Sequence, residues 1–222
     1  MLRPLPCLAF LFNLCARPVV ACDLALLLAL DISGSVDPKE YEIQRDGLAA
    51  ALRDATVTEA LVRARAQVSV MQWTGSSRQK ITIPWTEVGN FVDAETLAAR
   101  VSSDARVWRN YSTAIGEALQ VAIPTFATVP SCKRRVIDIS GDGTSNEGVE
   151  PAQMRAALRA ANITVNALVI ETDDADLTGY FWENVISGPE AFVVTADGFE
   201  AYADRIKHKL LREVTKQLAA RD

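Results

Sequence analysis

An unbroken apolar segment near the amino terminus limits the folds that this chain can adopt. Residues 24–30 read LALLLAL and lead directly into Asp31. A strand that is apolar at every position has to be covered on both faces, which is typical of the parallel sheets of α/β proteins. Burying a carboxylate at the end of such a strand costs free energy unless it has a partner. Asp31 and the small polar residues after it therefore indicate a site.

Strand-like and helix-like segments alternate along the rest of the chain. Short apolar runs predict further strands over 67–73, 79–85, 135–140, 163–170 and 191–195. Apolar residues at three- and four-residue steps predict helices over 38–61, 94–103, 112–127, 151–161, 176–186 and 198–219. We expect an α/β fold of the Rossmann-like, doubly wound kind: a mostly parallel six-stranded sheet with one antiparallel edge strand and helices on both faces.

The first 21 residues have the features of a secretory signal. Arg3 is followed by the apolar run CLAFLFNLCA, and the small residues VVA precede a cleavage point. We expect a signal peptide over 1–21, a single domain over 22–222, and an exported protein that is periplasmic or secreted. No apolar stretch reaches the roughly 20 residues that a membrane span requires, so no transmembrane segment is expected.

Cleavage of this signal would leave two of the four cysteines, Cys22 and Cys132. Two cysteines in an exported chain predict one disulfide. Cys22 lies nine residues before Asp31, and Cys132 lies ten before Asp142. On neighbouring parallel strands, about 4.8 Å apart, both cysteines would reach one rim with the roughly 5.5 Å Cα separation of a disulfide. The alternative is a lipoprotein signal, VVAC, with Cys22 acylated.

Three polar segments are predicted at one rim of the sheet, where folds of this class bind ligands. They are DISGS (31–35), Ser112–Thr113 at the start of a helix, and ISGDG, which places Asp142 at the end of a strand. Carboxylate and hydroxyl oxygens suit Mg²⁺, or else Mn²⁺ or Ca²⁺. Each segment also has an ordinary explanation, since Ser, Thr and Asp cap helices and Asp-Gly forms turns.

Together these segments resemble a known motif. D-x-S-x-S at 31–35, T-x-x-G-x-A-L at 113–119 and D-G at 142–143 are similar to the metal-ion-dependent adhesion site (MIDAS) of von Willebrand factor type A domains. The resemblance covers nearly all of the chain after the signal. The phrases LALDISGSVD and VIDISGDG resemble most a bacterial exported branch of uncharacterised function.

The resemblance implies a function and a set of ligands. Hydroxyl ligands would be Ser33, Ser35 and Thr113, and Asp31 and Asp142 would bind the cation directly or through water. The segment WRNYST has no glycines before the threonine, so Ser112 and Thr113 both stay open as the ligand. In this family a carboxylate of another molecule completes the coordination. The implied function is metal-dependent binding of a protein partner that presents an Asp or Glu, with no catalysis.

Two other functions compete with this one. Aspartyl phosphotransferases hold Mg²⁺ with D-x-D-x-T and a later G-D-G, but here Ser33 stands where their general acid would be. A structural module whose metal only stabilises the fold is the second alternative. A Ser-His-Asp hydrolase is not expected, because the only histidine, His208, lies between two lysines on a helix whose apolar face is formed by other residues. The net charge of −5 and the lack of a basic run argue against nucleic-acid binding.

Overall fold

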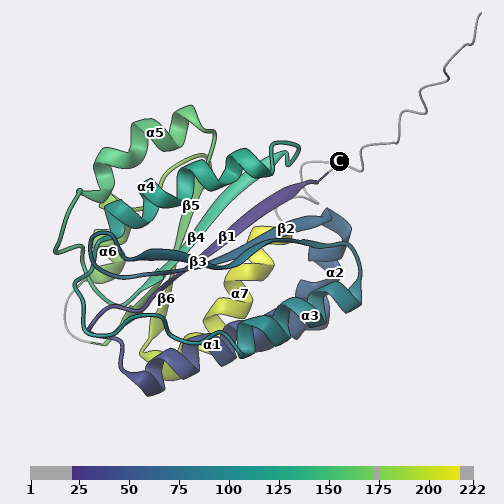
Figure 1. The fold of residues 1–222 in the computed structure, drawn as a ribbon, viewed down its shortest axis with the longest axis horizontal. Coiled ribbons are helices and arrows are strands. Elements are labelled where there is room, and N and C mark those ends of the chain that lie inside the picture. Colours follow the sequence, from purple (N-terminus) through teal and green to yellow (C-terminus); the bar gives the residue numbers. More distant parts are fainter. Residues whose placement is uncertain (1–21, 173–175, 216–222) are drawn as a thin grey trace, which may run out of the picture.

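The computed structural model describes residues 22–172 and 176–215. The predicted signal peptide, 1–21, and the end of the predicted last helix, 216–219, lie outside the described residues. The six strands form one sheet in the order β3-β2-β1-β4-β5-β6, and only the β2–β3 pair is antiparallel (Figure 1). The strands are β1 (Leu24–Asp31), β2 (Ala66–Trp73), β3 (Gln79–Val88), β4 (Arg134–Gly141), β5 (Thr164–Glu171) and β6 (Val193–Asp197). The predicted fold class is confirmed.

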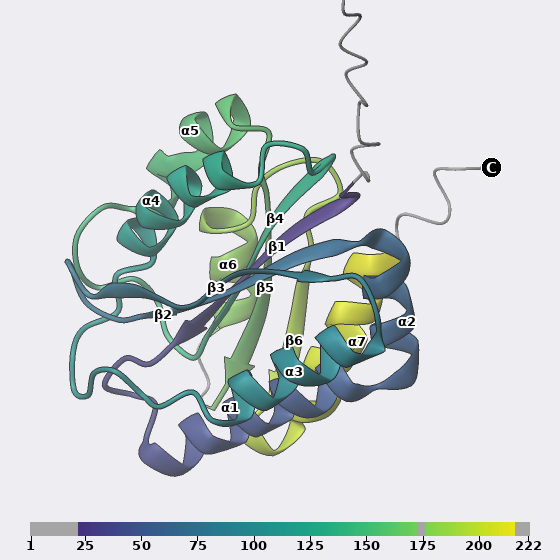
Figure 2. The same cartoon turned by 45° about the vertical axis from the view of Figure 1, so that its right-hand side comes forward.

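Strand β1 lies in the middle of the sheet and contributes side chains to both faces. On one face, the core between the sheet and helices α1, α2, α3 and α7 contains Leu24, Leu26, Leu28 and Leu30. The alternate side chains, with Leu27 among them, pack against α4, α5 and α6 on the other face. Figures 1 and 2 show these two helix layers on opposite sides of the sheet. The helices are α1 (Pro38–Arg53), α2 (Ala55–Ala64), α3 (Phe91–Ser102), α4 (Ile115–Thr125), α5 (Arg155–Ala160), α6 (Leu177–Asn184) and α7 (Tyr202–Thr215).

The single helix predicted over 38–61 is wrong, because the chain forms two helices that meet at Asp54. The backbone of Asp54 leaves the helical region, with φ −59° and ψ 130°, and its side chain accepts hydrogen bonds from the N–H groups of Thr56 and Val57. Asp54 therefore ends α1 and caps α2. The predicted helices over 151–161 and 198–219 begin later than expected, after 3₁₀ turns at Pro151–Met154 and Phe199–Ala201.

The expected disulfide joins the two cysteines that follow the signal. Cys22 lies just before β1 and Cys132 just before β4, with Cα atoms 4.4 Å apart. Because β1 and β4 are neighbouring parallel strands, their amino ends meet at one rim of the sheet. The backbone near the bridge is also paired, since the Lys133 N–H donates to the Cys22 carbonyl at 3.0 Å.

A buried group of charged side chains attaches α7 to β4. Lys209 on α7 is completely buried and makes an ion pair with Asp138 on β4. Its Nζ also lies 3.8 Å from the buried Glu213 carboxylate, to which Asn166 on β5 donates. Burial raises the pKa of both Asp138 and Glu213, and the charge of Lys209 opposes this. The last helix is therefore held to the sheet by polar as well as apolar contacts.

Removal of the disulfide should lower stability without changing the fold. The bridge spans a sequence separation of 110 residues, and loss of a native disulfide from an exported domain typically costs about 2–5 kcal/mol. In urea titrations we expect the free energy of unfolding of the double variant Cys22→Ala, Cys132→Ala to be lower than that of the wild type by an amount in this range. Intact mass of the protein purified without reductant checks the bridge itself. Two free thiols, or a lipid adduct on Cys22, would contradict it.

Replacement of Lys209 should be far more damaging than replacement of a neighbouring surface lysine. Lys209→Met leaves the buried carboxylate of Asp138 without its cation, and breaking a buried pair in this way costs about 3–5 kcal/mol. Lys207→Met is the matched control, since Lys207 pairs with Asp54 at 2.6 Å while 43% exposed, and such pairs contribute at most about 1 kcal/mol. Equal losses for the two variants in urea unfolding would show that the buried group does not stabilise the fold.

Candidate functional site

The strand order reverses between β1 and β4, and the candidate site lies beyond the carboxyl ends of these two strands. Asp31 is the last residue of β1, and Asp142 directly follows β4. Both strands are parallel, so their carboxyl ends meet at one rim. The disulfide lies at the amino ends of the same strands, at the opposite rim.

A continuous series of hydrogen bonds connects four of the predicted site residues. The Ser33 N–H donates to Asp31 Oδ1 at 2.7 Å, and the hydroxyls of Ser33 and Ser35 lie 3.1 Å apart. The Ser35 hydroxyl then donates to Asp142 Oδ1 at 2.7 Å. The loop after β1 is thus in contact with the end of β4, 107 residues later in the sequence.

Thr113 is buried beside these hydrogen-bonded residues, while Ser112 is exposed. The Thr113 side chain is buried, and its Oγ1 lies 3.9 Å from the position that a Cβ on Gly143 would occupy. The backbone of Thr113 is fixed by Asn146, whose side chain accepts from the Thr113 N–H and whose N–H donates to the Thr113 carbonyl, both at 2.9 Å. Thr113, and not Ser112, therefore faces the Asp142–Gly143 turn.

The hydroxyl groups of this site are not helix caps. Helix α1 is capped by Asp37, which forms a capping box with Glu40. Helix α4 begins after Ala114 without a capping side chain, and the Ile115 N–H donates to the Ser145 hydroxyl instead. The ordinary explanation of the serines and the threonine as caps is therefore wrong, and their oxygens are available for a ligand.

Two carboxylates approach each other here at an energetic cost. Asp31 is completely buried, and its Oδ2 has no hydrogen-bond partner among the described residues. Burial and then the nearby charge of Asp142 raise the pKa of Asp31 to about 8. Burial also raises the pKa of Asp142, and the hydrogen bond from Ser35 lowers it in part. A cation would stabilise both charged carboxylates, so the residues fit a metal ion.

The space around Asp31 Oδ2 is kept open by a glycine. A Cβ at Gly141, the last residue of β4, would lie 3.1 Å from this oxygen and 3.4 Å from the Phe181 ring. In the described part of the chain, no three His, Cys, Asp or Glu side chains come together as a metal cluster. A metal at this position would therefore need hydroxyl or water oxygens besides the carboxylates, which is the chemistry of Mg²⁺ and Ca²⁺ more than that of zinc.

Sequence reasoning missed the residues that support the site. Arg106 donates from Nη2 to the carbonyls of Ile32 and Ser33, each at 2.9 Å. The backbone carbonyl of Thr74, after β2, accepts from the Ala114 N–H at 3.2 Å and so fixes the start of α4. Asn146 belongs to the polar phrase GDGTSN, which follows Asp142 and could have indicated it. For Arg106 the sequence pattern contains no comparable signal.

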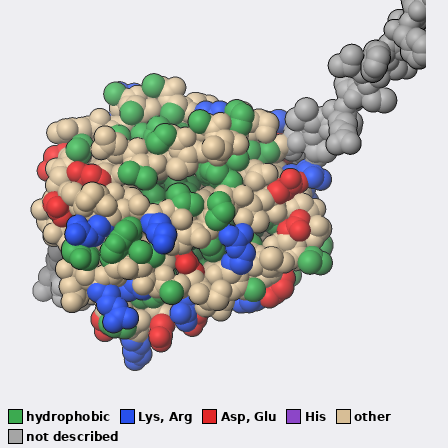
Figure 3. Space-filling view, in the orientation of Figure 1, with side chains coloured by type: hydrophobic (Ala, Val, Ile, Leu, Met, Phe, Trp, Pro, Cys, Tyr) green, Lys and Arg blue, Asp and Glu red, His purple; other side chains and the backbone are tan. Residues whose placement is uncertain are grey.

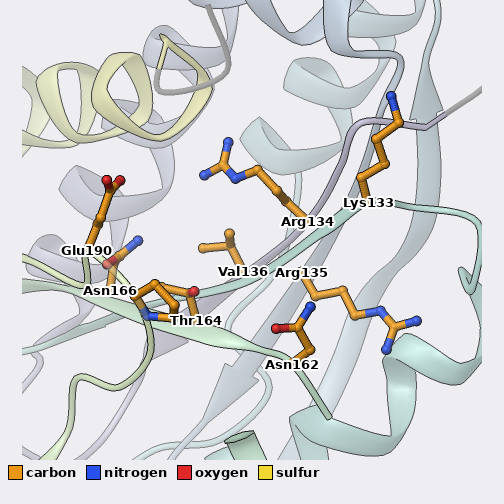
Figure 4. Close-up of a pocket in the computed structure, with 9 residues that line it drawn as sticks. Lys133, Arg134, Arg135, Val136, Asn162, Thr164, Asn166 and Glu190 are labelled. Atoms are coloured by element: carbon orange, nitrogen blue, oxygen red, sulfur yellow. The ribbon is translucent and has the colours of Figure 1, made fainter. Parts of the chain in front are cut away.

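A separate cavity of about 280 Å³ lies at the opposite rim, at the amino ends of β4 and β5. Three consecutive basic residues contribute to its lining, but their side chains point in different directions (Figure 4). Lys133 pairs with Asp23 at 2.7 Å, Arg134 donates to the Glu213 carbonyl, and Arg135 donates to the Ala161 carbonyl. Because each basic group already has a protein partner, this cavity is not the functional site that the motifs predict.

Solved structures with this fold include proteins of several kinds. Proximal thread matrix protein 1 from the mussel byssus is 20% identical over 86% of this chain and 48% of its own, with a TM-score of 0.65. A second structure of that protein has a zinc-occupied MIDAS motif. The pilus adhesin SpaC from Lactobacillus rhamnosus GG is 12% identical over 90% of this chain and 31% of its own, with a TM-score of 0.64.

A third structure is named for the fold itself. The von Willebrand factor type A protein from Catenulispora acidiphila is 16% identical over 86% of this chain and 43% of its own, with a TM-score of 0.59. The chain spans less than half the length of each of these three proteins. No curated protein matches its sequence. Residues 21–218 match the family described as a protein of unknown function, DUF1194, and the chain belongs to this family, with the fold of a von Willebrand factor type A domain.

Proposed function

We propose that this protein is a metal-dependent protein-binding module that captures an acidic side chain of its partner. The observation that carries the proposal is the completely buried Asp31, whose Oδ2 has no hydrogen-bond partner in the described chain and lies within electrostatic reach of Asp142. Such an arrangement is costly without a cation. The residues that would hold the cation share oxygen side chains at one rim: Asp31, Ser33, Ser35, Thr113 and Asp142.

The donor set favours Mg²⁺, with Mn²⁺ or Ca²⁺ as the other candidates. It contains two carboxylates and three neutral hydroxyls, which are hard oxygen ligands. The zinc-occupied MIDAS motif of the byssus protein supports a divalent cation in a motif of this kind. Both aspartates would bind the cation either directly or through water.

The charge of the site determines the kind of partner. When bound, a divalent cation with only two carboxylates near it would supply a positive centre that attracts a further carboxylate. Ser35 is exposed and Asp142 is half-buried, so a partner's Asp or Glu has access to this side of the site. The adhesin and matrix proteins among the similar structures support a role in protein binding. Basic and acidic side chains are interspersed on the face drawn in Figure 3, so this face has no continuous basic patch of the kind that binds nucleic acid.

A magnesium-dependent aspartyl phosphotransferase or phosphatase is the alternative. It would need a general acid two residues after Asp31, where the buried hydroxyl of Ser33 lies. A serine hydroxyl does not donate a proton at neutral pH as a carboxyl group does. His208 is exposed on α7, a helix that packs mainly against α1 and α2. A second alternative is a structural module in which the cation only stabilises the fold.

The disulfide supports an exported location, since structural disulfides persist in oxidising compartments. No helix among the described residues is long and apolar enough to cross a membrane. The proposed location is therefore the periplasm or the outside of the cell, after removal of residues 1–21. Acylation of Cys22 would compete with the bridge for the same sulfur, so the lipoprotein reading is the less favoured one.

Calorimetry should show one divalent-cation site that depends on the predicted ligands. We expect Mg²⁺ or Mn²⁺ to bind the wild type. The double variant Ser33→Ala, Asp142→Ala should bind the same ion at least about 100-fold more weakly, because even the loss of residues that only support metal ligands lowers metal affinity about 10–100-fold. Thr144→Ala is the control, because it removes an exposed hydroxyl two residues beyond Asp142. Equal binding by the wild type and the double variant would disprove the site.

Removal of the cation should abolish partner binding. We expect the immobilised protein to capture a partner from the exported fraction in Mg²⁺, and to lose it in chelator or with Asp142→Ala. A Glu-rich peptide should compete, whereas a matched Gln-rich peptide should not, because only the former presents carboxylates. Capture that survives chelation would favour the structural alternative. Release of phosphate from a generic phosphate ester that depends on Asp31 would favour the phosphotransferase.

A further inference from the structure

Arg106 holds the backbone of the loop that carries two of the proposed ligands. Its Nη2 donates to the carbonyls of two consecutive residues, Ile32 and Ser33, at 2.9 Å each. The Ser33 carbonyl also accepts from the Val36 N–H at 3.2 Å. Both carbonyls are therefore directed to donors from the protein, while the hydroxyls of Ser33 and Ser35 are directed toward each other and toward the second carboxylate.

The position of Arg106 is fixed from both sides by a buried glutamine. Gln72 on β2 is completely buried, and its Nε2 donates to the Ala105 carbonyl at 3.0 Å. Its Oε1 accepts from the Val107 N–H at 2.9 Å. The residues before and after Arg106 are thus attached to the end of β2 by one side chain. The backbone on both sides of Arg106 is therefore fixed by Gln72, and the guanidinium itself is held by the Ile32 and Ser33 carbonyls.

The charge of Arg106 alone does not explain its place. Its guanidinium interacts electrostatically with both Asp31 and Asp142, and would therefore repel a cation bound between them. A neutral donor would avoid this repulsion. The contribution that offsets it is geometric, because one planar guanidinium can hold two adjacent carbonyls in fixed directions.

We propose that Arg106 determines the cation preference of the site by keeping the Ile32 and Ser33 carbonyls away from the bound ion. Calcium takes six to eight oxygen ligands and often recruits backbone carbonyls, whereas magnesium takes six at shorter distances and retains water. With the carbonyls withheld, the remaining hydroxyls and carboxylates favour Mg²⁺ and Mn²⁺ over Ca²⁺. Arg106 is a positioning residue in this proposal, which rests on the proposed metal site.

The test compares Mg²⁺ and Ca²⁺ affinities by calorimetry in the wild type, Arg106→Gln and Arg106→Lys. Arg109→Gln is the matched control, since it removes the same charge from an exposed position in the same loop. We expect Arg106→Gln to weaken Mg²⁺ binding by about tenfold, the size of one charge-assisted hydrogen bond, with Ca²⁺ binding changed much less. Arg106→Lys should lie between, because it keeps the charge and a donating nitrogen but loses the planar guanidinium that fixes the directions of the two Nη2 hydrogen bonds. Arg109→Gln should leave the ratio of affinities unchanged.

A second measurement needs no metal. In chelator, hydrogen exchange of the backbone amides of 33–36 should be faster in Arg106→Gln than in the wild type or Arg109→Gln. An unchanged Mg²⁺ to Ca²⁺ ratio in Arg106→Gln would overturn the proposal, and so would an equal gain in both affinities, which is the effect of charge alone. If Arg106→Gln does not fold, an unchanged ratio in Arg106→Lys overturns it instead. Absence of cation binding by the wild type would overturn the metal site itself together with this proposal.

Discussion

Asp31 is completely buried at the end of the central strand, and its Oδ2 has no hydrogen-bond partner in the described chain. The surrounding structure is arranged around this carboxylate. The Ser33 N–H stabilises one oxygen, and Gly141 leaves space beside the other. Its pKa, raised to about 8 by burial and by Asp142, shows how unfavourable the charged form is without a cation. A protein that retains such a group gives up stability there, as is typical of functional sites.

The rest of the fold keeps this rim fixed from a distance. At the opposite end of the same two strands, the disulfide joins the starts of β1 and β4. Between the two ends, Asp138 on β4 pairs with Lys209 and so attaches α7 four residues before Asp142. Strand β4 is therefore held at its start by a covalent bond and in its middle by a buried ion pair. The carboxylate that it presents at its end is positioned by both.

Support for the site comes from segments that are remote in sequence. Gln72 fixes the residues on either side of Arg106, and Arg106 in turn holds the loop after β1. Thr74 and Asn146 fix the start of α4 from two other directions. None of these residues is a proposed ligand. Their common effect is to fix the backbone of the segments that carry Ser33 and Thr113.

The sequence by itself determined the strands, the two-layer arrangement of helices and the rim at which the polar segments meet, because these depend on local periodicity and on the parallel direction of the strands. It could not decide contacts between remote side chains. Lys209 lies on the buried face of α7, three residues after Ile206, and the sequence alone does not show that an aspartate from β4 pairs with its charge there. At Asp54 the sequence is compatible both with one continuous helix and with an aspartate that ends α1 and caps α2, and the structure has the second. That Thr113 faces inward while Ser112 is exposed, and that Arg106 reaches the loop after β1, was decided only by tertiary structure, since packing determines which of two neighbouring side chains is buried and which loop an arginine contacts.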